Sequence, residues 1–194
     1  MIKVLITPPA SEPLTGDEIK LFLHTDVDTS EEDRFIGKLI TMARLQVEAD
    51  TRGRVLLAQT WEYGWMYWPR HPYLQLPRGP ILSVVSFGYT DDDGAHTFAA
   101  DDYLLDPLDD KQLPLVRMQA PWPTALLRYP TGLRLRVTLG DTAPPEPLLG
   151  AMRALIAYWY DNREAALAST AYKAEVAVLP LQYEKLIGPY KYGP

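Results

Sequence analysis

The sequence contains no cysteine, which excludes disulfides and thiolate metal sites within these 194 residues. No run of about 18 apolar residues is present, so no segment is predicted to span a membrane. The first residues lack a charged region followed by a long apolar run, and we expect no secretory signal there. An excess of positive charge is also absent: 19 Lys and Arg against 25 Asp and Glu give a formal net charge of −6. This balance argues against a protein that grips a nucleic-acid backbone.

Residues that could carry chemistry are sparse. The three histidines lie in unrelated segments, without neighbouring ligands at metal-binding spacing. Residues 91–94 lack the twelve-residue ligand pattern of a calcium loop and are better interpreted as an acidic hairpin turn. The aspartate pairs at 101–102 and 109–110 lack an apolar pocket that would separate their pKa values for acid–base work. No phosphate-binding glycine loop or nucleophile elbow is present. The sequence therefore predicts no enzyme, no cofactor and no metal site.

What the sequence does contain is a clear succession of helix signals near its start. Thr15 and Glu18 have the spacing of a capping box and predict a short helix over Asp17 to His24. Ser30, followed by three acidic residues, predicts the N-cap of a second helix. Apolar residues then recur at spacings of three and four over about five turns. This stripe consists of Phe35, Ile36, Leu39, Ile40, Ala43 and Val47, with Arg34, Lys38, Arg44 and Glu48 on other faces and Gly53 as the stop.

From Arg54 the apolar period changes to two, which predicts strands. One strand lies in the aromatic run from Trp61 to Trp68, and another runs from Leu133 to Leu139. Between them, one face of a further strand is predicted to consist of Ile81, Ser83, Val85, Phe87 and Tyr89. The acidic turn at residues 91–94 then reverses the chain in a hairpin.

Helical periodicity returns at Pro147 and ends near Arg163, whereas residues 165–178 fit either a longer helix or a loop. Because helices at both ends flank a β-rich middle, we predict an α+β fold. It consists of a small helical bundle built from both chain ends, with an inserted antiparallel β barrel or sandwich. The predicted domains are residues 1–53 with 145–194, a discontinuous helical domain with a C-terminal arm, and residues 54–144, the β module.

The C-terminal arm carries an aromatic and aliphatic string with little chain around it to bury it. Such strings often find a groove on a partner, where aromatic anchors supply much of the binding energy. We therefore expect the last 20 or so residues to be mobile in the free protein and to become ordered on a neighbouring subunit or another protein. The expected contact residues are Tyr183, Leu186, Ile187, Tyr190 and Tyr192.

The order and spacing of four segments resemble those of a known protein family. The segments are PPASEPLTGDEIKLFLHTD, EEDRFIGKLITMARLQVEADTRGRVLLAQTWE, LPRGPILSVVSFGYTDDDG with ADDYLLD, and EPLLGAMRALIAYWYDNREA. Together they resemble the head–tail connector family of long-tailed double-stranded DNA bacteriophages and related gene-transfer particles. The resemblance extends from about Pro8 to Tyr190 and covers the larger version of the family, with a β module between helices.

The resemblance implies a structural virion protein, an adaptor without catalytic residues, made in the bacterial host cytoplasm and located in the virion neck. It implies a homo-oligomeric ring of about twelve copies beneath the portal protein. Such a ring extends the DNA channel and docks the next tail-side connector or terminator protein. Double-stranded DNA is expected to pass through without specific binding. A membrane partner is not expected.

A channel for DNA is expected to be acidic, because Lys and Arg would bind phosphates by counterion release and hold the duplex. Arg134 and Arg136 are therefore expected on the outer surface or at a subunit contact. The long loops and the helix starts offer two alternative sets of carboxylates. The candidate lining residues are Asp91, Asp92, Asp93, Asp101, Asp102, Asp109, Asp110, Glu31 and Glu32.

The aromatic run from Trp61 to Trp68 allows a second function. Trp and Tyr on alternate strand positions could stack on sugar rings, in a carbohydrate-binding module of a tail or an adhesin. The other interpretation is packing in the core or at a subunit interface, with aromatic pairs across strands. Ring formation with a portal would favour the connector, and saturable oligosaccharide binding would favour the glycan binder.

Overall fold

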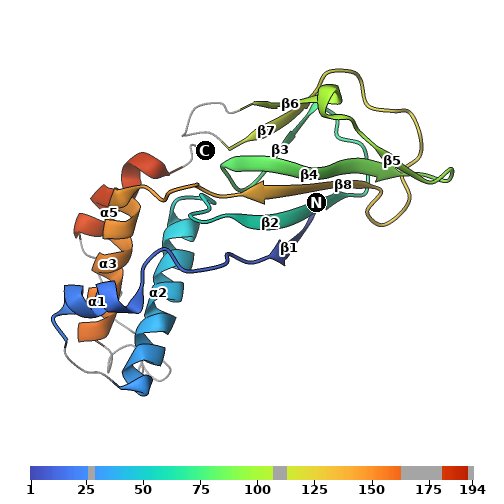
Figure 1. The fold of residues 1–194 in the computed structure, drawn as a ribbon. Coiled ribbons are helices and arrows are strands. Elements are labelled where there is room, and N and C mark those ends of the chain that lie inside the picture. The colour runs from blue at the N-terminus through green and yellow to red at the C-terminus, as the bar shows by residue number, and fades with distance from the viewer. Residues whose placement is uncertain (26–28, 107–112, 163–180, 192–194) are drawn as a thin grey trace, which may run out of the picture. The chain divides into compact units, whose positions relative to one another are not determined.

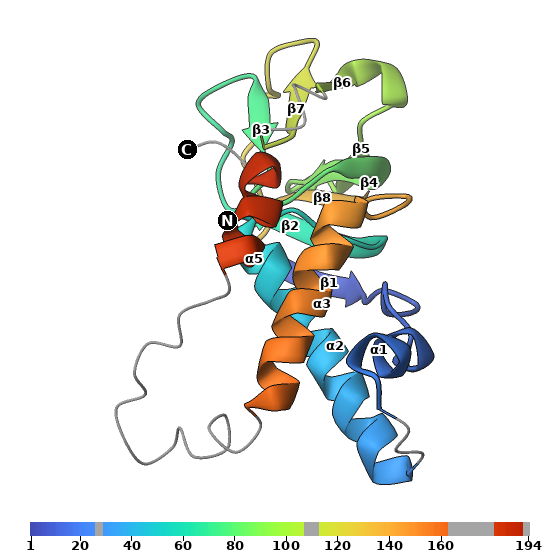
Figure 2. The ribbon, with the colours of Figure 1, turned by 90° about the vertical axis from the view of Figure 1, so that its left-hand side faces the viewer.

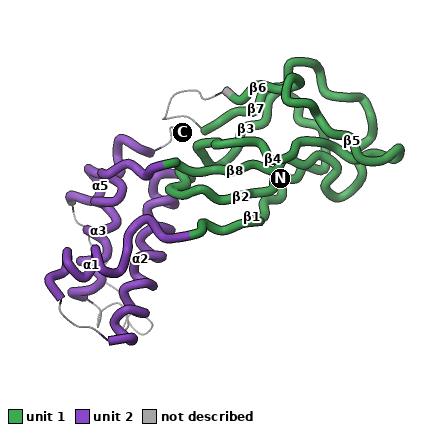
Figure 3. Tube along the Cα trace, viewed as in Figure 1, with its two compact units in different colours: residues 1–10, 53–142, 192–194 green, residues 11–52, 143–191 purple. Residues whose placement is uncertain are grey.

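The computed structural model of the chain describes residues 1–25, 29–106, 113–162 and 181–191 (Figure 1). Two compact units can be distinguished (Figure 3). Unit 1 comprises residues 1–10 and 53–142, and unit 2 comprises residues 11–52 and 143–191. The described strands belong to unit 1 and the described α-helices to unit 2, so the predicted α+β class is confirmed.

Unit 1 is built on a five-stranded antiparallel sheet of order β1-β2-β8-β4-β5. Its strands are β1 (Ile2–Thr7), β2 (Gln59–Trp65), β8 (Leu133–Leu139), β4 (Ile81–Thr90) and β5 (Ala95–Thr97). The central strand, β8, alternates as its sequence predicts, with Leu135 and Val137 fully buried between more accessible Arg134, Arg136 and Thr138. β5 follows β4 through residues 91–94, which confirms the predicted hairpin.

A second sheet covers one face of the first. It has the order β3-β7-β6 and consists of β3 (Tyr73–Gln75), β7 (Leu115–Met118) and β6 (Tyr103–Asp106), with the short helix η1 (Ala100–Asp102) before β6. Figure 2 shows it as a separate layer. The core contains side chains from both layers, such as Tyr63 and Leu135 from the first and Leu74 and Val116 from the second. The described strands form no closed barrel, so the sandwich alternative of the prediction applies.

Unit 2 is a small helical bundle, in which α3 packs against α2 and α5 (Figure 2). Its helices are α1 (Gly16–Leu23), α2 (Ser30–Asp50), α3 (Glu146–Asp161), α5 (Leu181–Ile187) and the short η2 (Gly188–Tyr190). The apolar stripe predicted for α2 is confirmed at Ile36, Ile40 and Val47, which are buried. In the described part of the chain, no helix is both long and apolar enough to cross a bilayer.

The helix starts confirm one predicted cap and correct the other. The Thr15 hydroxyl accepts a hydrogen bond from the Glu18 amide at 3.3 Å, and the Glu18 carboxylate accepts one from the Thr15 amide at 2.8 Å. This is the predicted capping box. The N-cap of α2 is Thr29, whose hydroxyl accepts from the Glu32 amide, whereas Ser30 is the first helical residue. The prediction of Ser30 was wrong because two adjacent hydroxyl residues precede the same acidic turn.

The exit from α2 depends on a glycine. α2 ends at Asp50, and Arg52 and Gly53 then adopt positive φ angles of 61° and 101°. A Cβ atom at Gly53 would lie only 2.4 Å from the carbonyl oxygen of Pro77. Glycine is therefore needed both for the backbone conformation and for the close approach of this segment.

The predicted face of β4 is wrong in its first half. The pairing with β8 shifts register between Ile81 and Ser83 and again between Val84 and Ser86. Each β-bulge adds a residue and so changes which side chains face the core. Val84 packs against the core as a result, whereas Val85 is 54% exposed.

The first residues also differ from the prediction, which placed residues 1–53 in the helical domain. Residues 1–10 belong to unit 1, where β1 pairs antiparallel with β2. All six side chains of β1 are exposed. Because no face of the strand is buried, its residues show no alternation from which a strand could be predicted.

Candidate functional site

The acidic residues predicted to line a channel are spread over three elements. Asp92 and Asp93 are exposed in the β4–β5 turn, and Asp101 and Asp102 are exposed in η1. Glu31 is exposed in the first turn of α2, and Glu32 beside it is half-buried. Asp109 and Asp110 lie outside the described residues. Among the described residues, no three His, Cys, Asp or Glu side chains gather in a way that could hold a metal ion.

Asp91 has a different role from the other candidates, because its side chain is buried. Its Oδ1 atom accepts hydrogen bonds from the amides of Asp93 at 2.9 Å and Gly94 at 3.1 Å, and lies 3.0 Å from Nε2 of His96. Burial works against the charged form, but the hydrogen bonds from His96 and from the two amides outweigh it and lower the pKa of Asp91. The carboxylate therefore shapes the hairpin. The turn surrounds this carboxylate, and its place in a channel lining stays a prediction.

The C-terminal string is only partly available for contacts. Tyr183 and Ile187, four residues apart on α5, are fully buried within unit 2, where α5 packs on α3. The Tyr183 hydroxyl donates to Oδ2 of Asp50 at 2.5 Å, and burial together with this carboxylate raises the pKa of Tyr183. α3 and α2 thus supply the cover that the local sequence lacks, and contact of these two residues with a partner stays a prediction. Leu186 and Tyr190 are half-buried and stay predictions, while Tyr192 lies outside the described residues.

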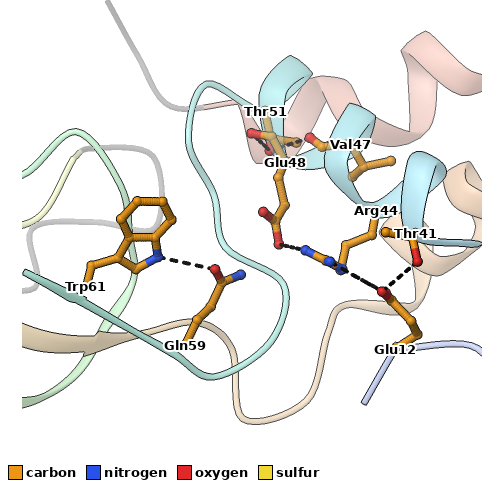
Figure 4. A network of polar contacts seen from close by, with 8 residues as sticks. All are labelled: Glu12, Thr41, Arg44, Val47, Glu48, Thr51, Gln59 and Trp61. Atoms are coloured by element: carbon orange, nitrogen blue, oxygen red, sulfur yellow. Dashed lines mark hydrogen bonds and ion pairs between the residues drawn. The ribbon is translucent and has the colours of Figure 1, made fainter. Parts of the chain in front are cut away.

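The aromatic run begins as a core strand. In β2, Tyr63 is fully buried, and Trp61 and Trp65 pack partly buried against the same core. The Trp61 indole donates to Oε1 of Gln59 at 3.2 Å (Figure 4), and the guanidinium carbon of Arg78 lies 4.7 Å from the centre of the Trp61 ring. These contacts occupy one face and the N–H edge of the Trp61 ring, which a stacked sugar would otherwise use.

The end of the aromatic run is likewise held inside unit 1. Trp68 makes an edge contact with Tyr89 at 5.1 Å between ring centres and lies 5.5 Å from Trp122. Its indole donates to the carbonyl oxygen of Ala125 at 2.7 Å. Tyr67 is the exposed aromatic residue of the run, at 76%. One exposed ring gives no stacking platform, so the structure favours the packing interpretation of this run.

The two arginines of β8 lie on the sheet face away from the core. Arg136 donates to Oε2 of Glu62 on β2 through two nitrogens, at 2.7 Å and 3.1 Å. Arg134 donates to the carbonyl and hydroxyl oxygens of Thr131, both at 3.1 Å. Both guanidinium groups therefore have contacts within the unit. Their predicted place at an outer surface or subunit contact stays a prediction.

A polar network in unit 2 was not predicted (Figure 4). Arg44 donates to Oε2 of Glu12 at 2.7 Å and lies 3.5 Å from Glu48, and Thr41 donates to Oε1 of Glu12 at 2.9 Å. Arg44 and Glu48 are buried, although the sequence placed them off the apolar stripe. Burial opposes the charge on Arg44, but the two carboxylates outweigh it and raise its pKa. The i, i+4 spacing was the available signal, whereas the partner 32 residues away gave none.

The sheet of unit 1 also presents apolar side chains at two edges, and the sequence did not predict this. In β1, four aliphatic residues are between 41% and 48% exposed; they are Ile2, Val4, Leu5 and Ile6. In the first half of β4, Leu82 and Val85 are 38% and 54% exposed. Exposed apolar groups that lie together on a soluble protein commonly mark an interaction surface.

No protein-family model matches the chain, and no curated protein matches its sequence. Solved structures share its fold over the full length. A chain in the virion of a native gene transfer agent (GTA) particle is similar with a TM-score of 0.76 at 18% sequence identity. A chain in the neck of the empty GTA particle, computed with C6 symmetry, gives 0.72 at 20% identity. A chain in the neck of the native GTA particle, computed with C12 symmetry, gives 0.73 at 20% identity.

Each of these matches covers 100% of this chain and 97% of the other. The class of fold is therefore one that occurs in the particles of a gene transfer agent. More particularly, it is the fold of chains in the neck of such particles. The fold expected from the resemblance to head–tail connectors is thus confirmed.

Proposed function

We propose that the protein is a structural component of a virion neck, a head–tail connector in a tailed phage or a gene-transfer particle. One observation carries this proposal: the likeness to GTA neck chains extends over 100% of this chain and 97% of theirs. Both units are included, so the likeness is not that of a single widespread domain. A role in assembly rather than catalysis accords with this, because the polar groups described above are engaged in holding turns, helices and strands.

We infer that the protein acts as a ring. The C12 symmetry of one GTA neck supports a homo-oligomer of twelve copies. Its place beneath the portal protein and above the next tail-side component is our proposal from the resemblance to head–tail connectors. The ring continues the DNA channel of the portal. Leu186 and Tyr190, half-buried near the chain end, remain candidates for contact with the portal or a neighbouring subunit.

The exposed carboxylates accord with a channel that does not hold DNA. They are Asp92, Asp93, Asp101, Asp102 and Glu31. Like charges repel the duplex, and this repulsion fades beyond about 8 Å at physiological salt, so it acts mainly in a narrow lumen. With a net charge of −6, the chain has no overall excess of positive charge to favour non-specific DNA binding.

Electron microscopy of the protein mixed with its own portal protein tests the proposal. We expect a twelve-fold ring of added density on one end of the portal, absent from portal alone. Truncated portal lacking its tail-side end is the matched control and should gain no ring. If the protein binds neither portal nor the necks of assembled particles, the proposed function is wrong. Titration with oligosaccharides, followed by Trp fluorescence, should give no saturable change.

A further inference from the structure

β1 is an edge strand without the usual protection of an edge. It pairs with β2 on one side, and it ends the five-stranded sheet on the other. Four of its six residues are exposed aliphatic side chains, and Lys3 is its one charged residue. Natural proteins usually protect an exposed edge with several charges, a proline or a cover, because an open edge pairs with other chains. β1 has only one bulge and one lysine as protection, so its open edge is suited to packing against another chain.

The opposite edge of the same sheet is also open in its first half. β5 pairs with Gly88–Thr90 of β4 and with no earlier residue of that strand. Among the described strands, none pairs with residues 82–86 on this side. The two bulges direct Leu82 and Val85 outward, and both are exposed. β1 and β4 lie on opposite sides of the β2–β8 pair (Figure 1).

The exposed part of β1 and the open part of β4 lie at the same position along the strand direction. Cross-strand pairing connects Val4 to Glu62, Glu62 to Arg136, and Arg136 to Ser86. The exposed aliphatic residues of β1 therefore lie at the level of the open part of β4. All three intervening ladders are antiparallel, so β1 and β4 run in opposite directions. A second copy placed edge to edge would continue the antiparallel pattern.

Charge is complementary between the two edges. Lys3 lies at the level of Phe87, through pairs with Tyr63 and Leu135. β4 ends three residues after Phe87 in the acidic turn, where Asp92 and Asp93 are exposed. In an edge-to-edge pair at this level, Lys3 of one copy lies on the strand five residues before Asp92 of the next, so the charges are opposite in sign without forming an ion pair. A second copy of the chain supplies an edge that matches β1 in level and in strand direction, and this match favours it over an unrelated protein as the occupant of β1.

We propose that neighbouring copies of this chain join edge to edge, with β1 of one copy packed along residues 82–86 of β4 in the next. The inference rests on the proposed ring. A ring closes through head-to-tail contacts between two different surfaces, and the two edges of one sheet supply such a pair. Their exposed aliphatic side chains become buried together, which supplies the favourable free energy.

Crosslinking tests the contact directly, because the chain has no cysteine of its own. A full-length variant with Val4→Cys and Val85→Cys, treated with a short bis-maleimide, should give a ladder of covalent oligomers on a denaturing gel. The variant with Val4→Cys and Leu126→Cys is the matched control; Leu126 is 82% exposed and lies outside both edges. It should give no ladder. Dimers from Val4→Cys alone would indicate a two-fold β1–β1 contact and overturn the proposal.

Charges introduced at the two apolar edges test the same contact in solution. Val4→Lys should lower the association constant of the protein at least tenfold, measured by mass photometry, because it places a second cation in the apolar edge. Leu126→Lys should associate like the wild type. Adding Val85→Glu to Val4→Lys should restore association, which a merely misfolded variant would not do. Circular dichroism melts check that all variants fold.

The outcomes separate the two proposals. If Val4→Lys forms rings like the wild type, or if rings form without a Val4–Val85 crosslink, the edge contact is wrong while the neck function stands. If the wild type stays monomeric both alone and with portal, the edge contact is also wrong. If the protein self-associates through these edges yet is absent from particle necks, the neck function is wrong and the edge contact stands.

Discussion

Tyr63 shows how a single residue can lower the stability of this fold. Its ring is fully buried in the core of unit 1, but among the described residues its hydroxyl has no hydrogen-bond partner. A buried hydroxyl without a partner typically costs about 1–3 kcal/mol. Burial also raises the pKa of Tyr63 to about 12. The residue therefore contributes through its ring, while its hydroxyl opposes folding.

We expect Tyr63→Phe to melt at the same or a higher temperature than the wild type at pH 7. The pKa of Tyr63 is raised in the folded state above an unfolded value of about 10, so its contribution to stability is fully present below about pH 10 and is lost as pH rises toward 12. Tyr63→Phe should therefore lose less stability in this window. Thermal melts at both ends of the window measure this, with exposed Tyr67→Phe as the control. A lower neutral melting temperature for Tyr63→Phe would show that the hydroxyl has a partner.

Single residues were predictable where their partners are close in sequence. Thr15 and Glu18 form their capping box within three residues, and the spacing alone identified it. The burial of Asp91 was not predicted, although its partners are also near in sequence. Its sequence indicated an acidic turn but gave no sign that one of the three carboxylates is buried against His96. The residue type shows that a side chain is charged, but it does not show whether that side chain points into the protein or toward solvent.

At the scale of elements, α5 is the helix whose role differs most from its prediction. Tyr183 and Ile187 place it in the core of unit 2 instead of on a mobile arm. We expect Ile187→Ala to lower the free energy of unfolding by about 2–4 kcal/mol, because it removes buried methyl groups and leaves a cavity. Urea unfolding measures this.

The matched control for that substitution is Gln182→Ala, on the exposed face of the same helix. It should leave the urea midpoint within the error of the wild type. If Ile187→Ala does the same, α5 does not pack as described and the hypothesis of a mobile arm is restored. The two variants together separate the packing of α5 from its helical propensity.

The elements that could be predicted are those with a buried face of regular period. α2, α3 and β8 each show it, since the apolar residues of each element face the interior of its own unit. β1 has no buried face, and the bulges of β4 interrupt its period. α5 is short and gains its burial from residues far away in sequence, as in the contact between Tyr183 and Asp50, 133 positions apart. The burial of these elements depends on contacts with residues far away in the sequence, and a single sequence does not reveal those contacts.

At the scale of the whole molecule, the net charge of −6 leads to a prediction about DNA. The isolated protein should not bind a short duplex at physiological salt, measured by fluorescence anisotropy, because its net negative charge gives no overall excess of cations to release counterions from the duplex. Lowering the salt should strengthen the repulsion rather than induce binding. A salt-dependent association at physiological ionic strength would contradict both the acidic channel and passage of DNA without specific binding.

The strand order has a consequence for how the chain is made. β8 lies at the centre of the five-stranded sheet, between β2 and β4, yet it is the last of these strands to be synthesised. Until Leu139 has left the ribosome, the pair β1–β2 and the hairpin β4–β5 lack the strand that joins them, and each is open toward the missing strand. Non-local pairing of this kind forms slowly and leaves edges open to aggregation in the meantime. A chain that stops before β8 therefore has neither a complete sheet nor correctly spaced edges, so translation itself excludes unfinished copies from assembly.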